Sequence, residues 1–256
     1  MLIDSHAHLD DERFDPDREN IISSLKENGI SLVVNPGSDL SSSIKAVRLS
    51  EEYENIYAAV GVHPHEAKAM SEETIEALRS LSAREKVVAI GEIGLDYFYD
   101  NSPRDIQKKC FLEQIRLAKE ADLPIIVHSR DAFQDTFDII NQEKDNRLRG
   151  VLHCYSGSEE MAREYIKLGF YISFGGPVTF KNSKVSKKVA QDIPLDKMLI
   201  ETDSPYLTPE PNRGKRNEPS YVKYVARTIA EIRGISFEEL AEKTAENAKN
   251  LFKIKE

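Results

Sequence analysis

The segment Leu2-Ile3-Asp4-Ser5-His6-Ala7-His8 begins with an apolar pair and ends with two histidines two positions apart. Side chains of a β-strand alternate between its faces, so a strand here places His6 and His8 on the same side. Two imidazoles on one face suit the binding of a metal ion better than the packing of an ordinary strand. The segment therefore predicts a first strand that leads into a metal site.

The other histidines fit the same pattern. The chain has six histidines, and the remaining four are His63, His65, His128 and His153. The strand pattern described next places each of them at the end of a strand. We therefore expect the histidines to gather at one rim of the fold.

Short apolar runs alternate with longer amphipathic segments along the whole chain. Most runs are continuous, as expected for strands that are buried on both faces. The eight runs are Leu2–His8, Leu32–Pro36, Ile56–His63, Val87–Ile93, Pro124–His128, Gly150–Cys154, Phe170–Phe174 and Met198–Asp203. The helical patterns are Arg18–Asn28, Leu40–Tyr53, Ser71–Leu81, Ser102–Ala121, Glu159–Leu168 and Ser236–Phe252.

This alternation predicts an α/β fold, a single (β/α)8 TIM barrel with closing C-terminal helices, in which residues 1–256 form one domain. The alternative is a doubly wound open sheet. No glycine-rich dinucleotide motif follows the first run, which disfavours that alternative. The polar candidates also come from nearly every strand, and only a closed barrel brings such residues together.

Composition narrows the class of protein. Apolar residues make up 40% and charged residues 31%, which is typical of a soluble globular chain. We expect no membrane span, no secretory leader and a cytoplasmic location, with Cys110 and Cys154 as free thiols. The net charge of −9 disfavours a protein that coats nucleic acid, although bound cations would supply positive charge locally.

Barrel enzymes carry their chemistry where the strands end, on the C-terminal face. The residues expected there are His6, His8, His63, Glu92, His128, His153 and Asp203. Imidazole nitrogen and carboxylate oxygen together suit zinc, manganese or a similar divalent ion. Four histidines and two carboxylates exceed the needs of one tetrahedral ion, so they suit two ions bridged by a carboxylate such as Glu92.

Each candidate also has a structural explanation. Glu92 lies in an apolar run, where a salt bridge would also account for a buried carboxylate. His128 and His153 could cap their strands, and Asp203 could cap a helix. We expect His63 to contact substrate and His65 to lie on the surface.

The motifs resemble those of the TatD family of metal-dependent deoxyribonucleases, a branch of the amidohydrolase-like barrels. The matching segments are Ile3–Leu9, Gly61–His65, Gly91–Tyr97, Pro124–Arg130, His153–Gly157 and Glu201–Leu207, with a similar ending at Asn247–Phe252. The resemblance implies that Glu92 bridges two ions. It also implies that one ion is completed by His6, His8 and Asp203, and the other by His128 and His153.

We therefore expect a hydrolase that uses two divalent metal ions (Mg, Mn or Zn) to cleave phosphodiester bonds in DNA, as an exonuclease on single-stranded or frayed ends. Asp203 and Glu92 are the expected catalytic residues, with Asp203 as the base. Arg130 is expected to bind phosphate with His63. We expect no stable protein partner.

Other features of the sequence allow more than one interpretation. The aromatic residues of Tyr97–Tyr99 could stack on bases or simply pack, and Arg213, Lys215 and Arg216 could follow the nucleic-acid backbone or form a solvated loop. The alternatives to a nuclease are a metal-dependent amide or ester hydrolase acting on a small molecule, and a non-catalytic metal-binding protein.

Overall fold

The computed structural model describes residues 1–254, in which eight parallel strands form one sheet in the order β1 to β8. The strands are β1 (Leu2–Asp4), β2 (Ile30–Pro36), β3 (Ile56–Val60), β4 (Val87–Asp96), β5 (Ile125–Arg130), β6 (Gly150–Leu152), β7 (Tyr171–Phe174) and β8 (Met198–Ile200). Each strand pairs with its neighbour in sequence, and this order excludes the doubly wound alternative. The fold is the predicted (β/α)8 barrel.

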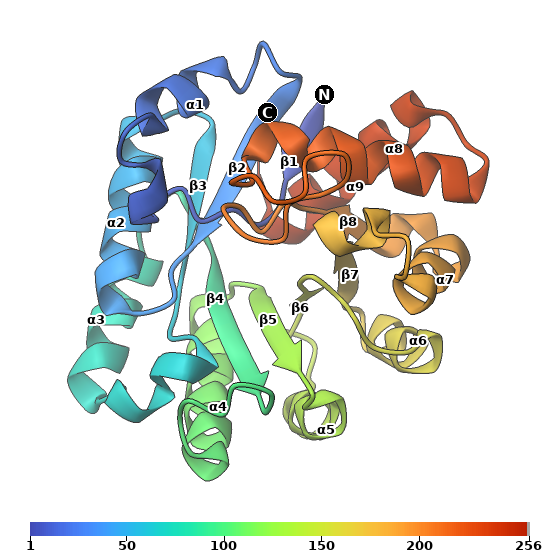
Figure 1. Cartoon of the computed structure of the whole chain (residues 1–256). Coiled ribbons are helices and arrows are strands. Elements are labelled where there is room, and N and C mark those ends of the chain that lie inside the picture. The colour runs from blue at the N-terminus through green and yellow to red at the C-terminus, as the bar shows by residue number, and fades with distance from the viewer. Residues whose placement is uncertain (255–256) are drawn as a thin grey trace.

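Helices lie between the strands on the outside of the sheet (Figure 1). They are α1 (Arg18–Ser24), α2 (Leu40–Glu52), α3 (Glu72–Ser82), α4 (Arg104–Ala121), α5 (Phe133–Glu143), α6 (Glu159–Lys167), α7 (Lys184–Asp192), α8 (Val222–Arg233) and α9 (Phe237–Phe252). Short 3-10 helices occupy Glu12–Phe14, Pro64–Ala69, Gly176–Thr179, Leu195–Lys197 and Pro219–Tyr221. The helices α5, α7 and α8 were not predicted from the sequence.

The helix starts follow from local side-chain chemistry. The side chain of Asp39 accepts a hydrogen bond from the backbone of Ser42, and Ser71 does the same for Thr74, so α2 and α3 both begin with capping boxes. The side chain of Ser236 caps α9 by accepting from the backbone N–H of Glu239. These caps satisfy backbone donors that the first turn of a helix leaves free.

The seam between the first and the last strand is closed by hydrogen bonds rather than by a full ladder. The backbone N–H of Ser5 donates to the carbonyl of Ile200 (3.1 Å), and that of Asp203 donates to the carbonyl of His6 (2.9 Å). Ala7 and Ser204 form an isolated parallel bridge. The start of the chain is therefore held against the end of the barrel.

Alternate residues of the strands face the barrel interior. One buried apolar cluster combines residues from seven strands, which only the inside of a barrel can bring together: Ile3, Val34, Ala59, Ala89, Ile126, Val151 and Leu199. Their strand neighbours, such as Leu2 and Met198, instead pack with the surrounding helices. The interior and the helical layer are thus two separate parts of the core.

The last helix closes one end of the barrel. Ala248, Leu251 and Phe252 of α9 belong to the same buried cluster as the interior strand residues. In Figure 1, α9 lies beside β1, at the end of the barrel where the strands begin. The predicted closing role of the C-terminal segment is thus confirmed for α9.

Four strands are shorter than predicted at their C-terminal ends, namely β1, β3, β6 and β8. Beyond β6 and β8 the backbone enters the left-handed region, with φ of 41° at Cys154 and 57° at Asp203. That conformation breaks a strand ladder and redirects the side chains that follow. The polar ends of these runs therefore leave the sheet and turn toward one another.

Candidate metal centre

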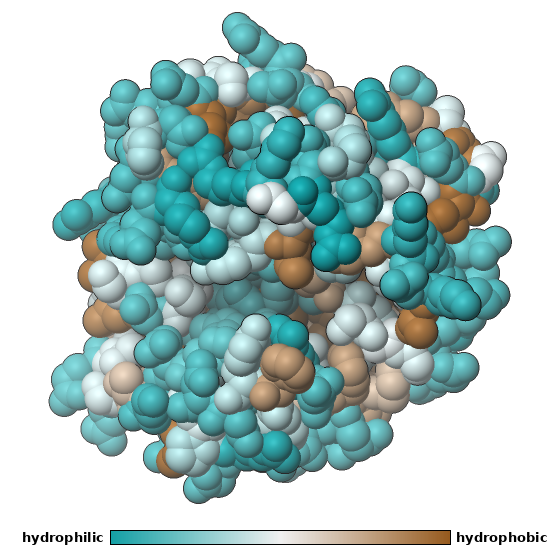
Figure 2. Space-filling view, in the orientation of Figure 1, coloured by the Kyte–Doolittle hydropathy of each residue, from teal (hydrophilic) through white to brown (hydrophobic). Residues whose placement is uncertain are grey.

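The C-terminal ends of the strands surround a cavity of about 890 Å³. All six predicted metal ligands lie in or directly beneath it, and five of them line its walls: His8, Glu92, His128, His153 and Asp203. Figure 2 shows a hollow in this face of the molecule, largely hydrophilic inside, with some apolar residues at the rim. His6 is fully buried below the others.

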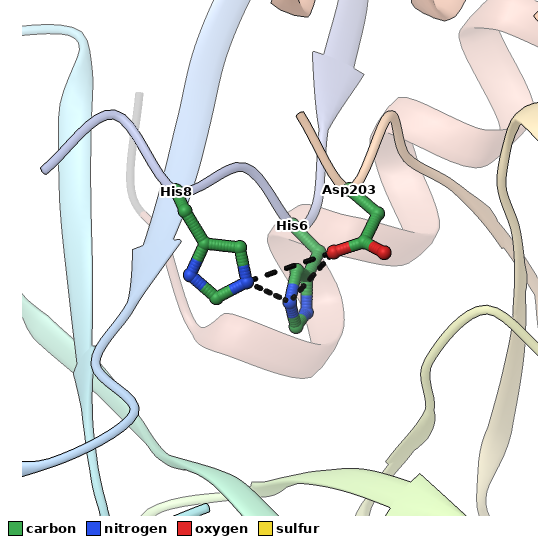
Figure 3. Close-up of side chains that lie close together, drawn as sticks. All are labelled: His6, His8 and Asp203. Carbon is green, nitrogen blue, oxygen red and sulfur yellow. Dashed lines mark hydrogen bonds and ion pairs between the residues drawn. The ribbon is translucent and has the colours of Figure 1, made fainter. Parts of the chain in front are cut away.

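The first group of side chains joins the segment after β1 to the segment after β8. The Nε2 atoms of His6 and His8 are 3.2 Å apart, and each lies within 3.7 Å of Oδ1 of Asp203. Figure 3 shows both rings turned toward this carboxylate. Oε2 of Glu92 approaches the same nitrogens, at 3.3 Å from His6 and 3.6 Å from His8.

The second group lies around the other oxygen of the Glu92 carboxylate. Oε1 of Glu92 is 2.8 Å from Nδ1 of His128 and 2.8 Å from Nε2 of His153, and these two nitrogens are 3.2 Å apart. Nε2 of His63 is 3.4 Å from the same Oε1. Each carboxylate oxygen of Glu92 therefore faces a different set of histidines.

These spacings fit bound divalent ions. Four ligands about 2.1 Å from zinc at tetrahedral corners are roughly 3.4 Å apart. In the first group, the Nε2 atoms of His6 and His8 are 3.2 Å apart, and each lies 3.3–3.7 Å from Oε2 of Glu92 and from Oδ1 of Asp203. The donor set is also the imidazole and carboxylate mixture that zinc and manganese accept. The residues thus match the metal that the sequence predicts.

Two further carboxylates, which the sequence analysis did not assign, orient the histidines. Oδ2 of Asp96 is 3.1 Å from Nε2 of His128, on the far side of the ring from Glu92. Oε1 of Glu201 is 3.3 Å from Nδ1 of His153. Asp96 and Glu201 lie four residues after Glu92 and two before Asp203, and such even spacings along a strand place side chains on one face. This alternation was the sequence signal that could have identified Asp96 and Glu201.

The surrounding charges perturb the ionisable groups. Burial favours the neutral form of Glu92, but the charges of His153, His63 and His6 outweigh it and hold the pKa of Glu92 well below its usual value. Burial also lowers the pKa of His63, to about 4, against the opposing charge of Glu92. Glu92 is thus an anion and His63 a neutral imidazole at neutral pH, the forms that bind a cation.

His65 does not lie on the surface, so that prediction is wrong. Its side chain is only 26% exposed, and its Nε2 is 2.8 Å from Oδ2 of Asp96. The fully buried Asp96 therefore contacts His65 and His128 at once. His65 lies in the 3-10 helix Pro64–Ala69, and only the tertiary packing of this segment beside β4 brings it to Asp96.

Arg130 lines the cavity at the end of β5. Its guanidinium carbon lies 4.1 Å from the ring centre of Phe98 and 4.8 Å from that of Tyr99. Both aromatic side chains are more than half exposed, whereas Tyr97 is partly buried and hydrogen bonds to Asp135. Phe98 and Tyr99 thus remain open to solvent beside the cavity, and Tyr97 packs.

The basic residues after β8 take up other contacts. Arg216 forms two hydrogen bonds with the carboxylate of Asp17, at 2.8 and 2.7 Å, and Arg213 lies 4.0 Å from the ring centre of Phe180. None of Arg213, Lys215 and Arg216 is among the residues that line the cavity within the described part of the chain. They belong to a loop outside the candidate centre.

Two other expectations concern the whole chain. Cys110 and Cys154 are free cysteines, as predicted. Among the helices of residues 1–254, none has both the length and the apolar character that crossing a membrane requires.

Comparison with known proteins gives a consistent result along the chain. The family model described as TatD related DNase matches residues 3–253. A Bacillus subtilis protein named uncharacterized metal-dependent hydrolase YabD is 54% identical over 254 residues, covering 99% of this chain and 100% of that protein. A Cronobacter sakazakii protein named 3'-5' ssDNA/RNA exonuclease TatD is 34% identical, covering 98% of this chain and 97% of that protein.

Solved structures agree with these relatives. The crystal structure of YjjV, a TatD homologue from Escherichia coli K12, superposes with a TM-score of 0.94 at 31% identity and covers 99% of this chain and 98% of that one. A TatD family hydrolase from Entamoeba histolytica superposes with a TM-score of 0.88 at 26% identity, covering 98% and 97% of the two chains.

Proposed function

Because the chain belongs to the TatD related DNase family, we propose that it is a metal-dependent hydrolase that cleaves phosphodiester bonds in DNA, as an exonuclease on single-stranded or frayed ends. The observation that carries this proposal is the position of the Glu92 carboxylate, whose two oxygens face different sets of histidines. A relative named as a 3'-5' ssDNA/RNA exonuclease supports the nucleic-acid substrate.

In this proposal two divalent ions, Mg, Mn or Zn, share the centre. One ion would be held by His6, His8 and Asp203, the other by His128 and His153, and Glu92 would bridge them. His63 lies 3.4 Å from the bridging carboxylate, close enough to complete the second set or to contact the substrate. Bound ions of this kind acidify water and offset phosphate charge.

The residues of the chain would divide the chemistry as follows. Asp203 accepts a proton from the attacking water, whose oxygen forms the new bond to phosphorus. The bond from phosphorus to the leaving sugar oxygen breaks, and that oxygen takes up a proton. Arg130, at the cavity wall, forms charge-assisted hydrogen bonds to phosphate oxygens. The exposed rings of Phe98 and Tyr99 offer surfaces on which unpaired bases stack.

We further propose that residues 1–256 act as one catalytic domain in the cytoplasm. The family match covers almost the whole chain, and the candidate centre uses residues that follow both the first and the last strand of the barrel. The two free cysteines fit a reducing compartment.

The test is digestion of 5'- and 3'-labelled single-stranded DNA, duplex DNA and RNA with Mg²⁺, Mn²⁺ or Zn²⁺. We expect the wild type to shorten single strands from an end and Glu92→Gln to lose activity by at least about 10³-fold, which is roughly 4 kcal/mol of transition-state stabilisation. Glu242→Gln makes the same chemical change on an exposed site of α9 and should keep full activity.

Two results would contradict the proposal. The first is no cleavage of any nucleic acid by the metal-loaded wild type, together with turnover of lactone or dipeptide substrates. The second is equal cleavage by the wild type and the Glu92→Gln variant.

A further inference from the structure

Glu201 is a buried carboxylate beneath the two groups of histidines. Its residue is 1% exposed, and it follows Ile200, the last residue of β8. Leu199 of β8 faces the barrel interior, and Glu201, two residues later, continues that face because its backbone N–H still donates to the carbonyl of Phe174 in β7. A carboxylate in such a site is costly unless several donors satisfy it.

Three sets of contacts surround this carboxylate. Oε1 accepts a hydrogen bond from the backbone N–H of Cys154 (2.6 Å), and Oε2 accepts one from the hydroxyl of Ser173 (2.6 Å). Oε1 also lies 3.3 Å from Nδ1 of His153. The first two contacts fix the carboxylate, and the third aims it at a histidine of the candidate centre.

Two ring nitrogens of the histidines above Glu201 lack a hydrogen-bond partner. The rings of His6 and His153 are stacked, with centres 4.1 Å apart and planes 13° apart. Their Nε2 atoms face the two oxygens of Glu92. Within residues 1–254, the Nδ1 atoms of both rings are buried and make no hydrogen bond.

Metal binding at Nε2 requires a hydrogen-bond acceptor beside each Nδ1 atom. A neutral imidazole that binds an ion through Nε2 carries its hydrogen on Nδ1, and a buried N–H requires an acceptor. A ring nitrogen of His6, a ring nitrogen of His153 and a carboxylate oxygen of Glu201 lie within 4.8 Å of one another. His6 belongs to the first group and His153 to the second.

We propose that Glu201 is a positioning residue that accepts the Nδ1 hydrogens of both His6 and His153, and so links the two metal subsites from beneath. Glu92 joins the subsites on the side of the cavity, and Glu201 joins them on the side of the barrel interior. One buried carboxylate then sets the orientation and basicity of a ligand to each ion. The inference rests on the metal centre proposed above, although it requires no particular substrate.

The experiment measures Mn²⁺ binding to chelator-treated full-length protein without substrate, following free Mn²⁺ by electron paramagnetic resonance. We expect two ions per wild-type chain. Loss of a carboxylate that orients a metal-bound histidine typically weakens metal binding by about 10- to 100-fold. Glu201→Gln should therefore weaken both binding steps by about this factor, while Glu242→Gln, on the exposed face of α9, should bind both ions as the wild type does.

A second variant covers the case in which Glu201→Gln does not fold. Ser173→Ala removes one hydrogen bond to Glu201 and leaves its charge in place. We expect a smaller loss of affinity, again in both steps. Unchanged affinity in this variant, with Glu201→Gln unfolded, would overturn the proposal.

The other outcomes are equally decisive. Weakening of one step alone would refute the link between the subsites. Unchanged Mn²⁺ affinity with a lower melting temperature would make Glu201 a purely structural residue. A third wild-type ion that is lost in Glu201→Gln would make it a ligand instead. Absence of Mn²⁺ binding by the wild type would refute the metal centre itself, whereas failure to cleave DNA with binding intact would refute only the substrate.

Discussion

The two ends of the barrel use the same strands in opposite ways. At the N-terminal end, Leu251 and Phe252 of α9 pack against interior residues such as Ile3 and Leu199 and leave the barrel closed and apolar. At the C-terminal end four strands stop early, and imidazoles and carboxylates such as those of His8 and Glu92 face a cavity of about 890 Å³.

The difference shows how one fold separates stability from chemistry. Apolar burial at the closed end stabilises the barrel in proportion to the area removed from water. The open end buries Glu92 and Asp96, which are tolerable only because neighbouring histidines pair with them. We therefore expect substitutions at the open end to reduce activity and substitutions at the closed end to reduce stability.

The largest effect should come from the open end. Asp203→Asn keeps the shape of the side chain and removes its ability to accept a proton, so the turnover rate on single-stranded DNA should fall by about 10²- to 10⁴-fold. The melting temperature of the metal-free protein should change little. Turnover within tenfold of the wild type would place the general base elsewhere.

The closed end should show the reverse pattern. Phe252→Ala removes a buried ring from the interior cluster, so the free energy of unfolding in urea should fall by about 3–5 kcal/mol. Turnover per folded molecule should stay at the wild-type value. The matched control is Phe98→Ala at the open end, where the ring is 57% exposed and stability should change by at most about 0.5 kcal/mol.

Arg130 offers a smaller effect at the open end. Arg130→Ala should raise KM for single-stranded DNA by about 10- to 100-fold, because a hydrogen bond to a charged group contributes about 1.5–3 kcal/mol. Stability should be unaffected, since this side chain is exposed. Arg213→Ala tests the loop after β8 in the same assay, and a larger loss there than in Arg130→Ala would relocate the phosphate contact.

A last effect, which appears only at alkaline pH, concerns the helical layer outside both ends. Burial raises the pKa of the Cys110 thiol to about 12. The thiol of the unfolded chain ionises near pH 8.5 to 9, so stability is complete below that pH and falls as the pH rises toward 12, by up to about 1.4 kcal/mol per pH unit. Urea unfolding between pH 8 and 11 should show a shallower loss in Cys110→Ala than in the wild type. Parallel curves for the two proteins would contradict this.

Much of the fold was predictable because the strands and helices of a parallel barrel alternate regularly along the sequence. Strands buried on both faces appear as continuous apolar runs, and capped helices begin at residues such as Ser71 and Ser236. The helices α5, α7 and α8 were missed. In α7, whose sequence is Lys-Val-Ser-Lys-Lys-Val-Ala-Gln-Asp, few apolar residues mark the buried face.

The sequence indicated which residues gather at the candidate centre. It did not indicate all of the contacts between them. The six proposed ligands were named because polar residues at the ends of apolar runs stand out. Asp96 and Glu201 were missed because their role depends on rings contributed by other strands. His65 was misplaced because its contact with Asp96 depends on how the 3-10 helix Pro64–Ala69 packs beside β4.

The amino-acid sequence alone determined the kind of fold and the chemical types gathered at its C-terminal rim, since periodicity and residue type are local properties. Tertiary structure alone decided which atoms face one another. It turned each oxygen of Glu92 toward a different set of histidines, placed Glu201 beneath two stacked rings, and closed the opposite end with α9. Such contacts join residues far apart in the chain, so they follow from barrel closure and not from any local pattern.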